Sequence, residues 1–462
     1  MDVNINKLST SPVTAPASGA DAHRAPEPPG VAIAGAGIIS AIGNNVADSL
    51  LSFEKEAAGM GAITLLDTIY KGRLPVAEVK ANNQELARWA GLSASAAGLA
   101  PSGHLTSGHV TGLAPHSQPT RGHVAGLAPS VSRTALLSLI AAKEALDDAA
   151  IPGIETLRTG LISANTVGGM DKMENFFECR LTDHSKDRLR EVVLHECGAV
   201  TEWAADRLGI RHYQTTISTA CSSSANAVLF AARLIRSGLL DVAVAGGADA
   251  LTKFTLNGFN SLMILDADPC RPFDDGRAGL NLGEGAGYLV LVSEKIAATL
   301  SRKPDVALSG YANTNDAWHQ TASSPDGRGS WLAMSGALQR SGLRPADIDY
   351  INLHGTGTQN NDLSEGTAIS RLFGEKIPRM SSTKSFTGHT LGASGGIEAV
   401  FSVLAVRHGL VYPNLRFKTP MTEQPLVPET AFLKDLPIRH VLSNSFGFGG
   451  SCTSLVFSKQ QR

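Results

Sequence analysis

The chain has 462 residues, of which 43% are hydrophobic and 18% are charged, and its formal net charge is −2. The hydrophobic fraction is sufficient for a folded core and excludes a wholly disordered chain. A nucleic-acid or membrane-surface binder would carry a basic excess, and no stretch approaches the ~18 apolar residues of a transmembrane helix, so we expect no nucleic-acid partner and no membrane insertion.

The first segment of the chain is typical of a disordered tail. Residues 1–29 contain five prolines and show no apolar periodicity. They also lack the basic start and the apolar core of a signal peptide. The five cysteines of the chain include no CxxC pair, which suits a reducing compartment. We therefore expect a cytoplasmic protein.

A short repeat follows further along the chain. The tetrapeptide GLAP occurs at 98–101, 112–115 and 126–129. Its period is too short for a solenoid unit, so we expect a flexible repeat insertion over 98–131. Metal capture by the histidines of the repeat is an alternative, but their spacing matches no established zinc pattern. These residues are His104, His109, His116 and His123.

Strand and helix patterns alternate through the rest of the chain. Short apolar runs indicate strands, and a 3.6-residue periodicity indicates helices. In the first part we predict strands at 31–39, 215–219, 241–251 and 285–294 and helices at 133–149 and 223–238. In the second part we predict strands at 306–312, 348–355 and a pair near 440–458, with helices near 330–342, from Asp362 and from Ile397.

This alternation predicts an α/β fold. Continuous apolar strands between helices imply a sheet that is covered by helices on both faces. The segments VAIAGAG and VALSGYA open the two parts in a similar way. We therefore expect two related α/β halves, residues 30–300 and 301–462. The glycines of GAGIIS (35–40) resemble a dinucleotide-binding fingerprint, but Ser40 replaces the third glycine, so we expect a strand-to-helix turn there instead.

Cys221 lies between a predicted strand and the helix that begins near Ser223. A thiol at this place faces the unpaired N–H groups and the positive end of the helix, and both favour the nucleophilic thiolate. Its neighbours are small, so a bulky substrate can approach. A cysteine that only packs in the core is the alternative, and the residues that accompany Cys221 decide between the two.

Two histidines follow predicted strands in glycine-rich segments. His354 opens HGTGT, and His389 lies in TKSFTGHTLGASGG together with Lys384. Glu398 follows in the next helix. The last strand pair carries SNSFGFGGS (443–451), whose glycines allow backbone N–H groups to come close to a reacting carbonyl. In the company of Cys221, these groups predict an active site.

The motifs STACSSS, NLHGTGT, TKSFTGHTLGASGG and SNSFGFGGS occur in this order, with RPFDDGRAGLNLGEGAGYLVL between the first and the second. The chain thereby resembles the β-ketoacyl-acyl-carrier-protein synthases from about residue 31 to 457, interrupted only by the repeat. The set of one cysteine and two histidines is similar to that of the elongating branch of this family. The resemblance implies a thiolase-like fold, with two duplicated α/β halves in a layered αβαβα arrangement.

The resemblance also implies a role for each candidate residue. Cys221 would take an acyl group from an acyl carrier protein as a thioester. His354 and His389 would stabilise the enolate that forms when malonyl carrier protein loses carbon dioxide. The backbone N–H groups of Cys221 and Phe448 would hold the oxyanion of the condensation step. Phe448 would also close the acyl pocket until Cys221 is loaded.

The remaining candidates surround these groups. Lys384 would set the charge and protonation of the site, and Glu398 would hold Lys384 in place, although a purely structural salt bridge is the alternative for this pair. The resemblance further implies substrate contacts at Thr356, Thr358, Phe446, Gly447 and Gly449, with the threonines hydrogen-bonding the phosphopantetheine arm.

The implied function is that of a 3-oxoacyl-[acyl-carrier-protein] synthase, an acyltransferase. It would catalyse the decarboxylative Claisen condensation of malonyl-acyl-carrier-protein with the acyl group on Cys221, in fatty-acid biosynthesis or in the related biosynthesis of a polyene or another specialised lipid. The expected partners are acyl carrier protein and a second copy of the chain, with no metal and no cofactor of the enzyme's own. The alternative is a non-catalytic subunit that sets chain length in a heterodimer, and such subunits have typically lost the nucleophile.

Overall fold

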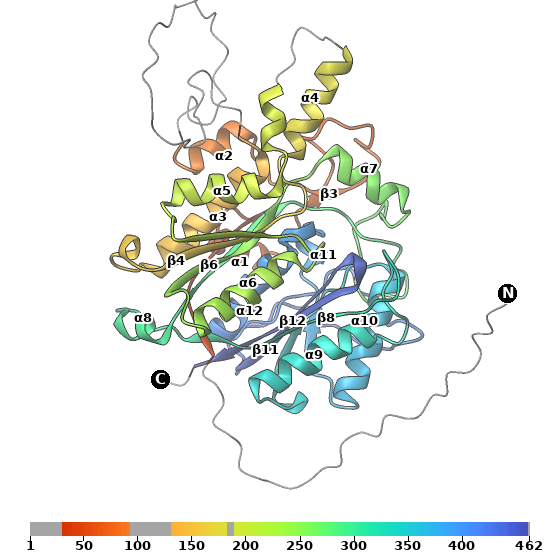
Figure 1. Ribbon diagram of the computed structural model, residues 1–462. Coiled ribbons are helices and arrows are strands. Elements are labelled where there is room, and N and C mark those ends of the chain that lie inside the picture. Colours follow the sequence, from red (N-terminus) through yellow and green to blue (C-terminus); the bar gives the residue numbers. More distant parts are fainter. Residues whose placement is uncertain (1–29, 93–130, 183–188, 461–462) are drawn as a thin grey trace, which may run out of the picture.

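The computed structural model describes residues 30–92, 131–182 and 189–460 (Figure 1). The expected tail at 1–29 and nearly all of the expected repeat insertion at 98–131 lie outside the described residues. No helix of the described part is long and apolar enough to cross a membrane.

Within the described residues, ten strands form one large sheet, in the order β10-β9-β11-β12-β8-β1-β7-β6-β4-β5. Its strands are β1 (Val31–Ser40), β4 (Thr159–Ala164), β5 (Tyr213–Ile217), β6 (Val242–Asp249), β7 (Gly285–Val292), β8 (Val306–Asn315), β9 (Tyr350–Asn352), β10 (Arg379–Ser381), β11 (His440–Phe446) and β12 (Ser451–Lys459). A separate small sheet pairs β2 (Met60–Gly61) with β3 (Val76–Ala77).

The large sheet consists of two parts with the same topology. The order β5-β4-β6-β7-β1 on one side repeats as β10-β9-β11-β12-β8 on the other. In each part the first three strands run parallel and the last two pair antiparallel to their neighbours. The two parts join where β1 pairs with β8 through Val31↔Leu308 and Ala32↔Ala307. This confirms the predicted duplication, while the division of the chain at residue 300 stays a prediction.

The helices complete a five-layer αβαβα arrangement (Figure 1). Helices α3 (Arg133–Ala149) and α5 (Cys197–Leu208) cover the outer face of the first part of the sheet, and α9 (Arg328–Ser341), with α10 (Gln359–Phe373) beside it, covers the outer face of the second. Helices α6 (Ser223–Arg236) and α12 (Ser394–His408) contact strands of both parts and form the middle layer. The thiolase-like fold is therefore confirmed.

The sequence of the middle layer fits this position. A helix that is hydrophobic on every side belongs in a core, and the residues of α12 from Ser394 to Val406 are all buried. The two middle helices also touch each other closely near their N-terminal ends. The N–H of Gly396 donates to Ser224 Oγ (2.7 Å), and a Cβ added at Gly395 would lie 2.8 Å from that of Ala225.

The prediction of a turn at GAGIIS was wrong, because these residues lie inside strand β1. Their glycines serve helix packing. A Cβ at Gly35 would lie 2.2 Å from the carbonyl oxygen of Ala145, and one at Gly37 would lie 2.2 Å from that of Ala141. Helix α3 therefore packs directly on the backbone of β1.

The remaining helices cover the edges and the ends of these layers. They are α1 (Val46–Glu54), α2 (Asn83–Trp89), α4 (Met170–Thr182), α7 (Lys253–Ser261), α8 (Glu294–Thr299) and α11 (Lys384–Thr387). Four loops meet at one end of the middle layer, and they carry the predicted site: β5 to α6, β9 to α10, β10 to α12, and β11 to β12.

Candidate active site

Cys221 lies in the tight turn between β5 and α6. Ala220 adopts a left-handed conformation (φ +52°), which turns the chain sharply before the helix. The turn is fixed by Ser223, whose hydroxyl accepts the N–H of Thr219 (2.7 Å) and donates to the carbonyl oxygen of Ala220 (2.5 Å). The Cys221 side chain is only 5% exposed.

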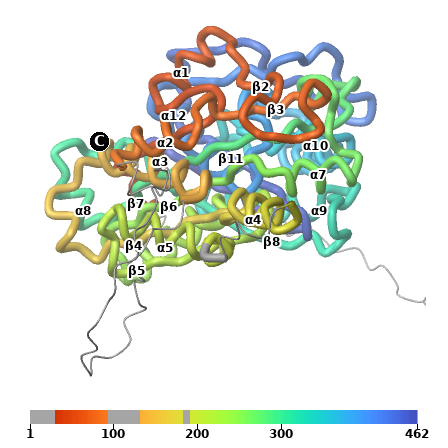
Figure 2. Tube along the Cα trace, turned by 90° about the horizontal axis from the view of Figure 1, so that it is seen from above, coloured from red at the N-terminus to blue at the C-terminus, as the bar shows by residue number. Residues whose placement is uncertain are grey.

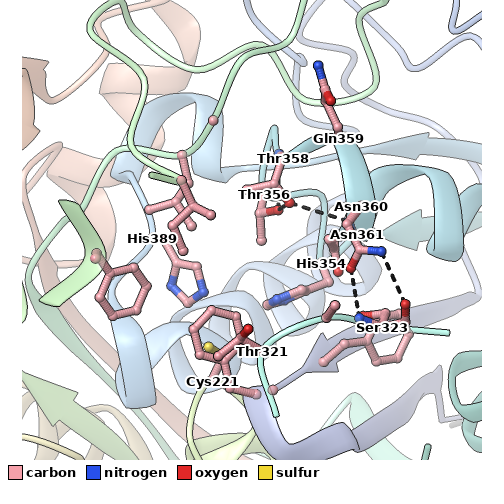
Figure 3. A pocket seen from close by; sticks show the side chains of 18 of the residues that line it. Cys221, Thr321, Ser323, His354, Thr356, Thr358, Gln359, Asn360, Asn361 and His389 are labelled. Carbon is pink, nitrogen blue, oxygen red and sulfur yellow. Dashed lines mark hydrogen bonds between the residues drawn. The ribbon is translucent and has the colours of Figure 1, made fainter. Parts of the chain in front are cut away.

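The fold brings His354 and His389 to this thiol (Figure 3). Sγ of Cys221 and one ring nitrogen of each histidine all lie within 4.8 Å of one another. The two imidazole rings are 5.5 Å apart and nearly perpendicular, at 88°. The three residues come from different loops of the two duplicated parts, so the site exists only in the folded chain.

Both imidazoles are neutral. Burial lowers the pKa of His354 and of His389 well below the usual value, and the Lys384 cation lowers both further. Nδ1 of His389 accepts the N–H of Leu391 (3.1 Å), and Nδ1 of His354 faces the Lys384 ammonium (3.3 Å), which can only donate. The proton of each neutral ring is therefore on Nε2.

This tautomer decides what the histidines can do. A neutral imidazole whose Nδ1 accepts a hydrogen bond presents Nε2–H as a donor. The spacing of Cys221, His354 and His389 is also compatible with a metal ion. However, a metal ligand needs a nitrogen without a proton, and Nδ1 of each ring is already occupied by a donor. The arrangement favours two hydrogen-bond donors aimed at a polarised oxygen.

Lys384 and Glu398 form a buried ion pair behind His354. Both side chains are about 2% exposed. The Lys384 ammonium donates to the carbonyl oxygen of His354 (2.7 Å) and to Oε1 of Glu398. Burial raises the pKa of Glu398 to about 7, and the Lys384 charge opposes this rise. The Lys384 ammonium therefore has three partners: the ring nitrogen Nδ1 of His354, the backbone carbonyl oxygen of His354 and the carboxylate of Glu398.

The protonation of Cys221 differs from the sequence-based expectation. Burial raises the pKa of the Cys221 thiol to about 11, although Lys384 and the N–H groups of Phe448 and Cys221 act in the opposite direction. The thiol form is therefore favoured, whereas the helix end alone predicted a thiolate. The prediction left out the burial of the side chain, which outweighs the nearby donors.

Two buried carboxylates that the sequence analysis missed hold the histidine loops. Glu365 of α10 accepts the N–H groups of His354 (2.9 Å) and Gly355 (2.8 Å). Asp249, at the end of β6, accepts the N–H of Gly392 (2.7 Å) in the loop that carries His389. Acidic residues on a buried helix face or strand end were the available signal, but their backbone partners are fixed only by the tertiary fold.

A cavity of about 320 Å³ opens onto Cys221, His354 and His389. The expected gate residue Phe448 also lines this cavity. So do four of the residues expected to contact the substrate, which are Thr356, Thr358, Phe446 and Gly447. Thr356 and Thr358 also hydrogen-bond each other through their hydroxyls (2.9 Å).

The remaining candidates lie off this wall. Gly449 is exposed and outside the lining of the cavity, so the expected substrate contact of Gly449 has no support in its position. Lys384 and Glu398 lie behind the wall, where they contact His354 and each other.

Phe259 of α7 also lines the cavity, and the sequence analysis missed it. Its ring stacks on Phe448, with the centroids 5.8 Å apart and the planes 16° from parallel. No motif marks this residue, because the contact joins positions that are far apart in the sequence.

Comparisons with known proteins point in one direction. Residues 55–297 match the β-ketoacyl synthase N-terminal domain, and residues 306–418 match the β-ketoacyl synthase C-terminal domain. The chain is 36% identical to 3-oxoacyl-[acyl-carrier-protein] synthase 2 of Staphylococcus aureus (strain COL) over 343 residues, which cover 71% of this chain and 82% of the relative. It is 37% identical to the synthase of the same name from Rhizobium meliloti (strain 1021), over 66% of this chain and 75% of the relative.

Solved structures with similar folds include two-protein assemblies. The ishigamide ketosynthase/chain length factor superposes with a TM-score of 0.79 at 28% identity, over 94% of this chain and 99% of the other. The ketosynthase ApeO in complex with its chain length factor ApeC, from Xenorhabdus doucetiae, superposes with a TM-score of 0.73 at 29% identity, over 93% and 98% of the two chains.

Proposed function

Because this chain belongs to the β-ketoacyl synthase family, and is an acyltransferase that condenses an acyl group with malonyl-acyl-carrier-protein in fatty-acid or related biosynthesis, we propose that Cys221 carries the acyl group and that His354 and His389 act on the malonyl group. The observation that carries this proposal is the meeting of one thiol and two neutral imidazoles in one cavity.

In the first half of the reaction, Sγ of Cys221 attacks the thioester carbonyl of the acyl carrier protein. A C–S bond to Cys221 forms, the bond to the phosphopantetheine sulfur breaks, and the thiol proton of Cys221 ends on that sulfur. The developing oxyanion needs fixed donors. The backbone N–H groups of Cys221 and Phe448, which lower the pKa of the thiol as hydrogen-bond donors, would supply them.

In the second half, the malonyl thioester loses carbon dioxide, and the electron pair of the broken C–C bond becomes an enolate. The Nε2–H groups of His354 and His389 stabilise the negative oxygen. The enolate carbon then attacks the carbonyl carbon of acyl-Cys221, and the Cys221 thiolate leaves and takes a proton from solvent to become the resting thiol. The product is a 3-oxoacyl thioester on the carrier protein.

Other residues position these groups. Lys384 keeps Nδ1 of His354 as an acceptor, and Glu398 holds Lys384. Thr356 and Thr358, with hydroxyls on the cavity wall, fit the polar phosphopantetheine arm. Phe448 closes the acyl pocket until Cys221 is loaded. The protein needs no cofactor of its own, because the phosphopantetheine of the carrier protein holds both substrates.

We propose a homodimer that works in the cytoplasm. Strand β5 is an edge of the large sheet, and its residues are partly exposed, whereas β6 and β7 are fully buried. All five thiols of the chain are free, which suits a reducing compartment. Light scattering after size-exclusion chromatography would give twice the chain mass, and a single-chain mass would contradict the proposal.

The alternative of a non-catalytic chain-length subunit is disfavoured by the intact set of Cys221, His354 and His389. The test is intact-mass spectrometry after incubation with acyl carrier protein that carries an acyl group. We expect an acyl adduct on the wild type that is absent from Cys221→Ala. Cys197 lies outside the cavity, so Cys197→Ala should keep the adduct. His354→Ala and His389→Ala should keep the adduct but lose carbon dioxide release from malonyl carrier protein. Condensation by Cys221→Ala would refute the proposed function.

A further inference from the structure

Two phenylalanine rings face each other at the cavity wall. Phe448 lies in the glycine-rich loop between β11 and β12, and Phe259 lies near the C-terminal end of α7. Their stacked rings line the same cavity as Cys221. The proposed gate therefore has an aromatic neighbour that comes from a different element.

The loop of Phe448 is anchored by polar contacts to one neighbouring segment. Asn315 Nδ2 donates to the carbonyl oxygen of Gly449 (3.0 Å). The N–H of Gly449 donates to the carbonyl oxygen of Gln320 (2.8 Å), and the N–H of Asp316 donates to the carbonyl oxygen of Gly450 (2.8 Å). These bonds hold the backbone after Phe448. None of them fixes the Phe448 ring, whose aromatic contact within the described residues is Phe259.

Helix α7 gives Phe259 a fixed position. The side chain of Thr252 caps the helix by accepting the N–H of Thr255 (3.1 Å). Glu174 of the neighbouring helix α4 accepts the N–H groups of Lys253 (3.2 Å) and Phe254 (2.6 Å). Helices α4 and α7 lie side by side in both views (Figure 2). The ring of Phe259 is thus presented by an element that is tied down at its start.

We propose that Phe259 is a positioning residue that holds the Phe448 gate in its closed position. The inference rests on the proposed function, in which Phe448 closes the acyl pocket and its N–H serves the oxyanion. Because hydrogen bonds hold the backbone after Phe448, the ring can turn about its side-chain bonds while the loop stays in place. The stack with Phe259 therefore acts on the position of the ring, and so on acyl entry.

The test compares two acyl lengths. Phe259→Leu keeps an apolar side chain but removes the ring, and Phe259→Tyr keeps the ring. With acetyl- and dodecanoyl-acyl carrier protein as probes, Phe259→Leu should raise the long-to-short ratio of kcat/KM by about threefold to tenfold, the range expected for one aromatic pair. Its kcat with the acetyl substrate should stay close to that of the wild type, because the backbone of the loop remains anchored. Phe259→Tyr should keep the wild-type ratio.

Two further variants separate this role from a structural one. Phe254→Leu, on the same helix, 64% exposed and off the cavity wall, should match the wild type. Adding Phe259→Leu to Phe448→Leu should change the ratio no further, since the stack is already lost. The proposal would be overturned if the double variant raised the ratio by the product of the two single effects. It would also be overturned if folded Phe259→Leu left the ratio unchanged. If Phe259→Leu fails to fold, Phe448→Leu alone must show the raised ratio, and its absence overturns the proposal equally. A wild type that takes up no acyl group refutes the proposed function instead.

Discussion

At the scale of single residues, Lys384 is a buried cation that lies beside one histidine of the cavity. Lys384 touches His354 and Glu398, and all three side chains are nearly inaccessible to solvent. A buried ion pair gives little net stability, but removing one partner leaves an uncompensated charge, at a cost of about 3–5 kcal/mol. Stability and catalysis can therefore be separated at this pair.

Lys384→Met should destabilise the fold by about 3 kcal/mol and abolish condensation while Cys221 can still be acylated. Adding Glu398→Gln removes the stranded carboxyl charge and should recover most of the stability. It does not restore the donor at Nδ1 of His354, so condensation should stay low. Thermal melting, adduct mass and product formation measure the three effects. Condensation that returns together with stability would show that the pair is purely structural.

The neutral state of His389 predicts a pH-dependent contribution to stability. Its pKa in the folded chain lies well below the unfolded value of about 6.5, so the unfolded chain takes up the proton first as the pH falls. This contribution to folding is fully present above the unfolded pKa and is lost below it, by about 1.4 kcal/mol per pH unit. Between pH 7.5 and 5.5, His389→Ala should therefore lose about 1.4 kcal/mol less unfolding free energy than the wild type. Urea unfolding at both pH values measures this, and parallel losses would contradict a neutral His389.

At the scale of elements, the contact between β1 and α3 leaves no room for a side chain. A Cβ at Gly37 would lie 2.2 Å from the carbonyl oxygen of Ala141 and 2.5 Å from the nitrogen of Ala145. Because both atoms belong to helix backbone, Gly37→Ala should move α3 and cost about 3 kcal/mol. Gly61→Ala, with open space around its Cβ, should stay within about 0.5 kcal/mol of the wild type. Chemical denaturation of the two variants measures this, and equal stabilities would contradict the packing argument.

The elements that local rules determine were predictable. Helix α3 has the predicted bounds, because its periodicity is clear, Ser132 caps it, and Pro152 and Gly153 follow it. The glycines of β1 were misassigned, because a glycine that admits a helix has the same sequence signal as one that makes a turn.

The candidate site was likewise predictable only where a local motif marks its residues. Cys221, His354 and His389 were identified through motifs, and the structure brings them together. Phe259 was missed because its partner Phe448 lies far away in the sequence. Glu365 was missed because no motif shows that the loop before its own helix folds back onto its carboxylate. The raised pKa of Cys221 was missed for a related reason, since burial depends on the whole fold.

At the scale of the whole molecule, the middle layer should make the two halves unfold together. Helices α6 and α12 each contact both parts of the large sheet, so neither part keeps its core without the other. Trp89 and Trp203 report on the first half, and Trp318 and Trp331 on the second. Two variants that each retain one pair, with the other pair changed to phenylalanine, should give the same urea midpoint by fluorescence. Separate midpoints would show that the halves are independent domains.

The duplication also places Cys221 and His389 at equivalent positions. One precedes α6 after β5, and the other precedes α12 after β10, in two parts of the same topology. If the two parts were identical units, the same residue would precede the middle helix in both of them. Because both parts belong to one covalent chain, the two positions can differ, and the thiol of Cys221 lies close to the imidazole of His389. Two different side chains thus stand at matching positions of a scaffold whose two parts share one topology.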